Sequence, residues 1–195
     1  MRRCRGTALL MCMLMVAVVL LLGVSGARIA LQDQRAARNE RDRKTAFQAA
    51  EAALLDAQLD IEQAAGSARG ALFAAGAPAF PADCGAASSR ALLGLCAGVA
   101  DAPAWLRVDF TDEHAASTRT VAYGQFTGQR MPVGMATLPQ RLPRYLIEAY
   151  ADRRAGAGAD LPASAPIYRI SAIGFGAQDG TRVLLQAWYR RTGAH

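Results

Sequence analysis

The chain has 195 residues, of which 52% are hydrophobic, 19% charged and 7% aromatic. This composition excludes a disordered polyelectrolyte and leaves folded or membrane-tethered proteins. Because 43 residues are alanine, which buries little area, a large enzyme core is not expected. The net charge of +6 is uneven, since three arginines lie within the first five residues. The basicity is therefore local.

An uninterrupted apolar run occupies residues 8–24, and no charge occurs between Gly6 and Ala27. As a helix, residues 8–27 would span about 30 Å, the thickness of a bilayer's hydrocarbon core. Three kinds of segment fit this run: a signal peptide cleaved after Ala27, a signal anchor, and a hydrophobic helix retained after removal of a short leader. Basic residues on both sides leave the positive-inside rule ambiguous.

Two of the four cysteines, Cys4 and Cys12, lie in the basic start and the apolar run. The other two, Cys84 and Cys96, have no histidine nearby, so their spacing fits no zinc site. We expect a disulfide between Cys84 and Cys96, which indicates an oxidising compartment. The C-terminal part is therefore expected outside the inner membrane, with the N-terminus inside.

The helical pattern continues beyond the apolar run, because residues 28–65 contain no glycine and no proline precedes Pro78. One helix is predicted over residues 7–65, ended by Gly66, Gly70 and Gly76. A narrow apolar stripe follows the second half of this helix. We expect the stripe to pack against the folded domain of the same chain, against other subunits, or against both. Its members are Phe47, Ala50, Leu54, Ala57, Ile61, Ala64 and Ala68.

Short strands are predicted after an irregular segment that contains the two cysteines and a short helix near residues 89–95. A hairpin turn at Ala177-Gln178-Asp179-Gly180 is expected to use the positive φ angles that Asp-Gly favours. Its second strand would place Val183, Leu185, Ala187 and Tyr189 on one face. An antiparallel sheet of about four strands packed on the helix is predicted, which gives an α+β fold. The predicted strands are residues 105–110, 119–126, 144–150, 167–175 and 181–190.

Little in the sequence indicates catalysis, because the only histidines are His114 and His195 and no catalytic triad, zinc-binding histidine pair or phosphate loop occurs. No enzyme activity, catalytic residue, cofactor or metal site is predicted. Acidic residues at Asp109, Asp112 and Glu113 indicate a solvated strand end. The charged residues 35–44 alternate in sign at helix-pairing distances, so no specific nucleic-acid partner is predicted.

Several strings, together with the short basic leader and the hydrophobic helix, resemble bacterial type IV pilins, and more specifically the PilX group of minor pilins. The similarity is spread over most of the chain. The strings are Asn39 with Arg41-Asp42-Arg43, residues 46–54 (AFQAAEAAL), residues 143–148 (PRYLIE) and residues 168–176 (YRISAIGFG).

The resemblance implies cleavage by a prepilin peptidase between Gly6 and Thr7 and methylation of the new amino terminus. The fifth mature residue would be Met11, where major pilins carry a glutamate that pairs with a neighbour's amino terminus. The implied organisation is type IV pilin-like. It comprises a leader (1–6), a transmembrane half-helix (7–27), an extracytoplasmic amphipathic half-helix (28–65), an irregular disulfide-bearing segment (66–104) and an antiparallel β-sheet head (105–195).

The function that follows is that of a single-pass inner-membrane minor pilin, with a cytoplasmic N-terminus and a periplasmic head, that primes or caps pilus assembly. Its expected partners are other major and minor pilins and a pilus-tip adhesin. Motility and cell adhesion would be properties of the whole pilus. The alternatives are a type II secretion pseudopilin and a secreted or anchored binding module with a conventional signal peptide.

Overall fold

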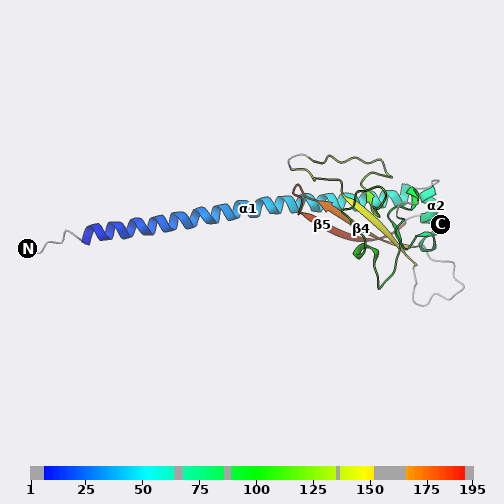
Figure 1. Ribbon diagram of the computed structural model, residues 1–195, viewed down its shortest axis with the longest axis horizontal. Helices are drawn as coiled ribbons and strands as arrows, with labels where there is room; N and C mark the ends of the chain where they lie inside the picture. The colour runs from blue at the N-terminus through cyan, green and yellow to red at the C-terminus, as the bar shows by residue number, and fades with distance from the viewer. Residues whose placement is uncertain (1–6, 64–67, 86–88, 135–136, 152–165, 192–195) are drawn as a thin grey trace, which may run out of the picture. The chain divides into compact units, whose positions relative to one another are not determined.

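The computed structural model describes residues 7–63, 68–85, 89–134, 137–151 and 166–191 (Figure 1). The chain forms two compact units, residues 1–41 and residues 42–195. A long N-terminal helix and a five-stranded sheet confirm the predicted α+β, pilin-like class. The elements are α1 (Thr7–Gln63), α2 (Ala68–Ala75), the 3₁₀ turns η1 (Ala77–Ala79), η2 (Arg90–Leu92) and η3 (Ala104–Leu106), β1 (Leu95–Ala97), β2 (Val121–Ala122), β3 (Arg144–Tyr150), β4 (Ile167–Phe175) and β5 (Arg182–Arg190).

Helix α1 follows the predicted course to Gln63, and the predicted end at residues 64–66 lies outside the described residues. Gly70 does not end helical structure, as the sequence suggested, because it lies inside the short helix α2. That helix stops at Gly76, whose φ of 68° is accessible to glycine and whose N–H donates to the Leu72 carbonyl at 3.0 Å.

The sheet has the strand order β1-β3-β4-β5, with β2 also paired to β3. Strands β3, β4 and β5 confirm three of the predicted strands. All of β3 pairs antiparallel with β4, and all of β4 pairs antiparallel with β5. The expectation of a purely antiparallel sheet was wrong, because Leu95–Ala97 pairs parallel to β3 and makes the sheet mixed. Strand β5 alternates as predicted, with Val183, Leu185, Ala187 and Tyr189 on its more buried face.

The prediction of a strand at residues 105–110 was wrong. Ala104–Leu106 forms the 3₁₀ turn η3, and the Ala104 N–H donates to the Glu148 carboxylate at 2.8 Å. Asp109 then accepts hydrogen bonds from the N–H and the hydroxyl of Thr111. The N–H groups of residues 106–108 donate to the carbonyls of Pro103 and Ala104 rather than to a neighbouring strand, so alternation alone did not make a strand here.

Only Val121–Ala122 of the predicted strand at residues 119–126 pairs with the sheet. The chain then turns at Gly124, whose φ is 75° and whose N–H donates to the Asp56 carboxylate at 2.7 Å. A carboxylate from helix α1 therefore ends the strand.

The hairpin between β4 and β5 forms as predicted, but not with the backbone that Asp-Gly suggested. Gly180 is not among the described residues with positive φ. Instead, Asp42 of α1 accepts hydrogen bonds from the N–H groups of Ala177 and Gln178, at 2.6 and 3.3 Å. The turn is held by the helix on which the hairpin lies.

Helix α1 packs very closely on β4. A Cβ atom on Gly174 would lie 2.0 Å from the Ala46 carbonyl oxygen and 2.4 Å from the Ala50 nitrogen. A Cβ on Gly176 would lie 2.5 Å from an Asp42 carboxylate oxygen. Only glycine on the strand permits this approach between the backbones.

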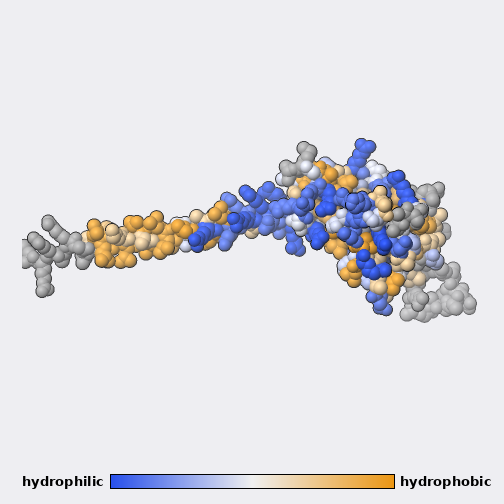
Figure 2. All heavy atoms as spheres, viewed as in Figure 1, coloured by the Kyte–Doolittle hydropathy of each residue, from blue (hydrophilic) through white to orange (hydrophobic). Residues whose placement is uncertain are grey.

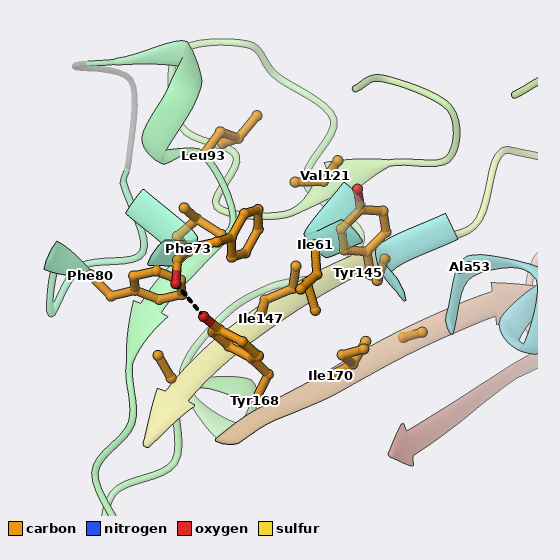
Figure 3. Close-up of a cluster of buried hydrophobic side chains, with 14 residues drawn as sticks. Ala53, Ile61, Phe73, Phe80, Leu93, Val121, Tyr145, Ile147, Tyr168 and Ile170 are labelled. Atoms are coloured by element: carbon orange, nitrogen blue, oxygen red, sulfur yellow. Dashed lines mark hydrogen bonds between the residues drawn. The ribbon is translucent and has the colours of Figure 1, made fainter. Parts of the chain in front are cut away.

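An aromatic cluster fills the space at the far end of this contact (Figure 3). Phe73 packs edge-on against Tyr168 with the ring centroids 5.7 Å apart. The Tyr168 hydroxyl donates to the Phe73 carbonyl at 2.6 Å, as the dashed line shows. This bond satisfies the polar end of a fully buried side chain.

Replacing Gly174 with alanine should lower the free energy of unfolding by about 3 kcal/mol, because backbone atoms of α1 would have to move. The measurement is denaturant unfolding of the full chain in detergent, followed by the fluorescence of Trp105 and Trp188. Gly180→Ala is the matched control, since a Cβ there meets nothing within 4 Å. Equal stability of the two variants would contradict the close packing.

Burial raises the pKa of Tyr168 to about 12, from an ordinary value of 10.0. The neutral phenol therefore stabilises the fold fully below pH 10, and this contribution is lost as the pH rises towards 12. The free energy of unfolding of the full chain should fall over that interval, and Tyr168→Phe should reduce the slope. Identical slopes for wild type and variant would contradict this role.

Candidate functional site

The first unit is a helix whose large apolar side chains are exposed (Figure 2). They include Leu9, Leu10, Met13, Leu14, Val16, Val18, Leu20 and Leu22. By length and composition, α1 is the one helix in the described part of the chain that could cross a membrane. A helix that is apolar on every side is stable where lipid or other protein covers it.

The predicted processing residues lie at the start of this helix. Gly6 is outside the described residues, and Thr7 is the first residue of α1. Met11 is 69% exposed within the apolar segment. Cleavage between Gly6 and Thr7 stays a prediction.

The structure divides the predicted packing stripe between the head and the surface. Ala50, Ala57 and Ile61 are fully buried in the head, and Leu54 is partly buried beside them. Phe47 is 42% exposed, on a different side of the helix from the buried alanines. Ala64 lies outside the described residues. Leu55, which the stripe did not include, is 60% exposed.

Three aspartates on the head-facing side of α1 were missed in the sequence. Asp42, Asp56 and Asp60 are each buried, although acidic residues on a helix usually face water. Each lies three or four residues from a buried alanine, and this helical spacing is the sequence signal that could have found them. Each carboxylate accepts hydrogen bonds from a different part of the head.

Asp60 forms the most buried of these contacts. Arg69 of α2 donates to its two oxygens from Nε and Nη2, at 2.7 to 2.9 Å, and the Tyr145 hydroxyl donates at 3.0 Å. Burial and the neighbouring Asp60 charge raise the pKa of Tyr145 well above its usual value. The guanidinium also stacks on the Phe126 ring, 3.9 Å from its centroid. One ion pair thus connects both helices to the sheet.

The same arginine anchors the segment between the two cysteines. Arg69 Nη1 donates to the carbonyls of Ala91 and Leu93, at 2.7 and 3.0 Å. The segment is closed by the Cys84–Cys96 disulfide, which the structure contains as predicted. Both cysteines are buried in a second apolar cluster on the other side of the sheet from α1.

Asp56 fixes the turn after β2. It accepts hydrogen bonds from the Gly124 N–H and the Thr127 hydroxyl. Burial raises the pKa of the Asp56 carboxyl, although both hydrogen bonds act in the opposite direction. The folded chain therefore binds a proton at Asp56 more readily than the unfolded chain does.

A second ion pair lies in the sheet itself. Glu148 of β3 is fully buried and accepts hydrogen bonds from Arg169 of β4 at 2.8 and 2.9 Å. The Arg169 guanidinium lies over the rings of Tyr150 and Trp188, 5.2 and 5.6 Å from their centroids. Glu148 also accepts the N–H of Ala104, so it connects the sheet to η3.

The acidic group at residues 109–113 has local partners. Hydrogen bonds from Thr111 lower the pKa of Asp109, and hydrogen bonds from Ser117 and His114 lower that of Asp112. Among the described residues, no group of three or more histidine, cysteine or acidic side chains could hold a metal ion.

Comparison with known families assigns the chain. A model described as type IV pilus assembly protein PilX, C-terminal, matches residues 83–191, which is more than half of the chain. The PilX N-terminal model matches residues 5–55. The chain belongs to the PilX family. No curated protein and no solved structure matches it.

The two PilX regions meet in the folded head. Ala46 and Ala50 lie in the N-terminal match and Gly174 in the C-terminal match, where they form the closest backbone contact described above. PilX proteins are structural components of the type IV pilus and associate with other pilins, so the family supports a minor pilin role. The apolar N-terminal helix is consistent with a single-pass inner-membrane protein.

Removing Arg69 should be costly because the buried Asp60 would lose its counterion. Arg69→Met should lower the free energy of unfolding by about 3 to 5 kcal/mol, and the double variant Asp60→Leu/Arg69→Met should be closer to wild type. The measurement is denaturant unfolding of the full chain in detergent.

A matched control is Glu113→Gln, because Glu113 pairs with Arg141 at a more exposed site, 3.6 Å apart. Its effect should stay within about 1 kcal/mol. Additive losses in the double variant would contradict a coupled pair.

Proposed function

We propose that this PilX-family chain primes or caps type IV pilus assembly at the inner membrane and the pilus tip. In this proposal a prepilin peptidase removes residues 1–6 on the cytoplasmic side. The apolar part of α1 then holds the chain in the membrane, with the head in the periplasm. The α1 surface contacts other pilins, and the head contacts minor-pilin partners and a tip adhesin.

The observation that carries the proposal is the side chain at Met11. The fifth mature residue would be an exposed thioether in an apolar helix rather than a carboxylate. A carboxylate in hydrocarbon is costly unless a positive group pairs with it, and major pilins are thought to use that pairing to add the next subunit. A subunit without the carboxylate is suited to the end of a pilus.

Phe47 and Leu55 support a role for the periplasmic half of α1 in contacts with other pilins. Both side chains are exposed, at 42% and 60%, and both lie on a helix whose opposite side is covered by the head. The predicted stripe therefore serves the head through Ala50, Ala57 and Ile61, and exposed neighbours are left for other subunits.

Deleting the gene should strongly reduce surface pili, because priming precedes growth of the shaft. The measurement is the number of pili per cell, in a strain with the other minor pilins intact. The wild-type chain should restore piliation, and Gly6→Val should not, because the peptidase would leave the leader in place.

Mass analysis of the wild-type chain should give a methylated amino terminus at Thr7. A start at Arg28 would instead indicate a conventional signal peptide. Normal piliation after deletion, with loss of protein secretion, would favour a type II secretion pseudopilin.

A further inference from the structure

The head contains a pocket of about 440 Å³ that no part of the proposed function uses. One wall comes from the disulfide-closed segment, through Ser89, Arg90 and Leu93. The other walls come from Glu113, Ala115 and Thr118 before β2, from Ala122 in β2 and Gln125 after it, and from Arg144, the first residue of β3. Leu93 and Val121 of β2 belong to the same buried cluster (Figure 3). The charged and polar side chains lining it are Arg90, Arg144, Glu113, Ser89, Thr118 and Gln125.

Arg144 is the unusual member of this set. It is only 7% exposed, yet it lines the pocket. Its Nε donates to the Thr120 hydroxyl at 2.7 Å, and its Nη2 donates to the Thr118 hydroxyl and the Thr120 carbonyl, both at 2.8 Å. Its third nitrogen, Nη1, forms no hydrogen bond with the described residues. Nη1 is not fully buried, and Arg144 lines the pocket, so this nitrogen can bond a group that enters there.

No carboxylate of the described residues contacts this buried cation. Glu113 and Asp112 act on Arg144 only at longer range. Each has another partner: Glu113 pairs with Arg141, 3.6 Å away, and Asp112 accepts a hydrogen bond from the His114 N–H at 3.0 Å. Burial lowers the pKa of Arg144, and the charges of Glu113 and Asp112 only partly oppose this effect. A buried charge without a paired charge is costly, so the guanidinium is set to accept an anion.

The charges lining the pocket favour one class of anion. Arg90 and Arg144 contribute two positive charges and Glu113 one negative charge, so the lining carries a net charge of +1. A monoanion neutralises that charge, whereas a phosphate dianion would leave the pocket with an excess negative charge. A carboxylate also accepts hydrogen bonds from a guanidinium in favourable geometry.

We propose that this pocket binds a carboxylate group presented by an acidic side chain of a neighbouring pilin. The pocket has polar and apolar lining and opens at the surface of the head, where a projecting side chain can enter. This inference deepens the proposed function, because it names a contact by which the head holds another subunit, and it rests on the family's association with other pilins.

The first experiment measures binding of N-acetylglutamate α-amide, a single carboxylate on a short side chain, to the full chain in detergent. Saturation-transfer NMR of the probe gives the dissociation constant. The neutral N-acetylglutamine α-amide is the matched probe and should bind at least about tenfold more weakly. Equal binding of both probes, or no binding of either, would overturn the proposal.

Variants place the probe in the pocket. Arg90→Glu reverses the net charge of the lining and should weaken carboxylate binding at least about tenfold. Arg107→Glu makes the same charge change at an exposed arginine that does not line the pocket, and should leave binding unchanged. Ala115→Phe fills the pocket without altering charge and should also abolish binding. These three positions are exposed, so the head should fold in each variant.

The second experiment identifies the source of the carboxylate. We measure the amount of other pilins that co-purifies with the tagged full chain from piliated cells. This amount should fall at least about fivefold for Arg90→Glu and Ala115→Phe, but not for Arg107→Glu. Probe binding with unchanged co-purification would overturn a pilin as the source and leave a free carboxylate as the ligand. The probe measurement needs no pili, so its failure is distinguishable from normal piliation after deletion, which would overturn only the priming role.

Discussion

The head depends on how closely helix α1 approaches strand β4. A Cβ atom on Gly174 would have no room beside the backbone of Ala46 and Ala50. The neighbouring buried residues of α1 include further alanines, whose short side chains allow the helix to lie close to the strand. Small residues on both surfaces bring the backbones together and bury little area per side chain. The larger apolar residues, including Tyr145, Tyr168 and Ile147, gather in one buried cluster with Ala53 and Ala57 of α1 (Figure 3). Alanine and glycine therefore determine how close the backbones come, and the large side chains fill the rest of the core.

The close approach also explains why acidic residues occupy the buried side of a helix. With α1 near the sheet, the short side chain of aspartate reaches backbone N–H groups and a guanidinium in the head. Asp42 holds the β4–β5 turn, Asp56 the turn after β2, and Asp60 the arginine of α2. Both oxygens of Asp56 and of Asp60 have fixed donors in place of water, which offsets the cost of burial, whereas Oδ2 of Asp42 is buried without a partner among the described residues. Arg144 differs because it donates to threonine oxygens and contacts no carboxylate of the described residues. For this reason we propose that its pocket binds an anionic group.

The sequence predicted long, regular elements better than short ones. Strands β3, β4 and β5 and the course of α1 followed from periodicity that extends over many residues, and the Cys84–Cys96 bond followed from the exclusion of other partners. The segment at residues 105–110 has the same alternation, but its N–H groups at residues 106–108 bond the carbonyls of Pro103 and Ala104 and make a turn. Phe47 was placed on the stripe by helical spacing, yet the head covers the alanine side and leaves it exposed.

By itself, the sequence determined the family, the apolar helix, the α+β class and the disulfide, because these depend on local composition, spacing and recognisable strings. Only the tertiary structure decided which charges are buried and what they bind. Nothing in the sequence around Asp56, Asp60, Glu148 and Arg144 shows that they are buried, and their roles arise from partners in other segments of the chain. Burial is a property of the packed chain, since desolvation depends on which segments approach one another in space.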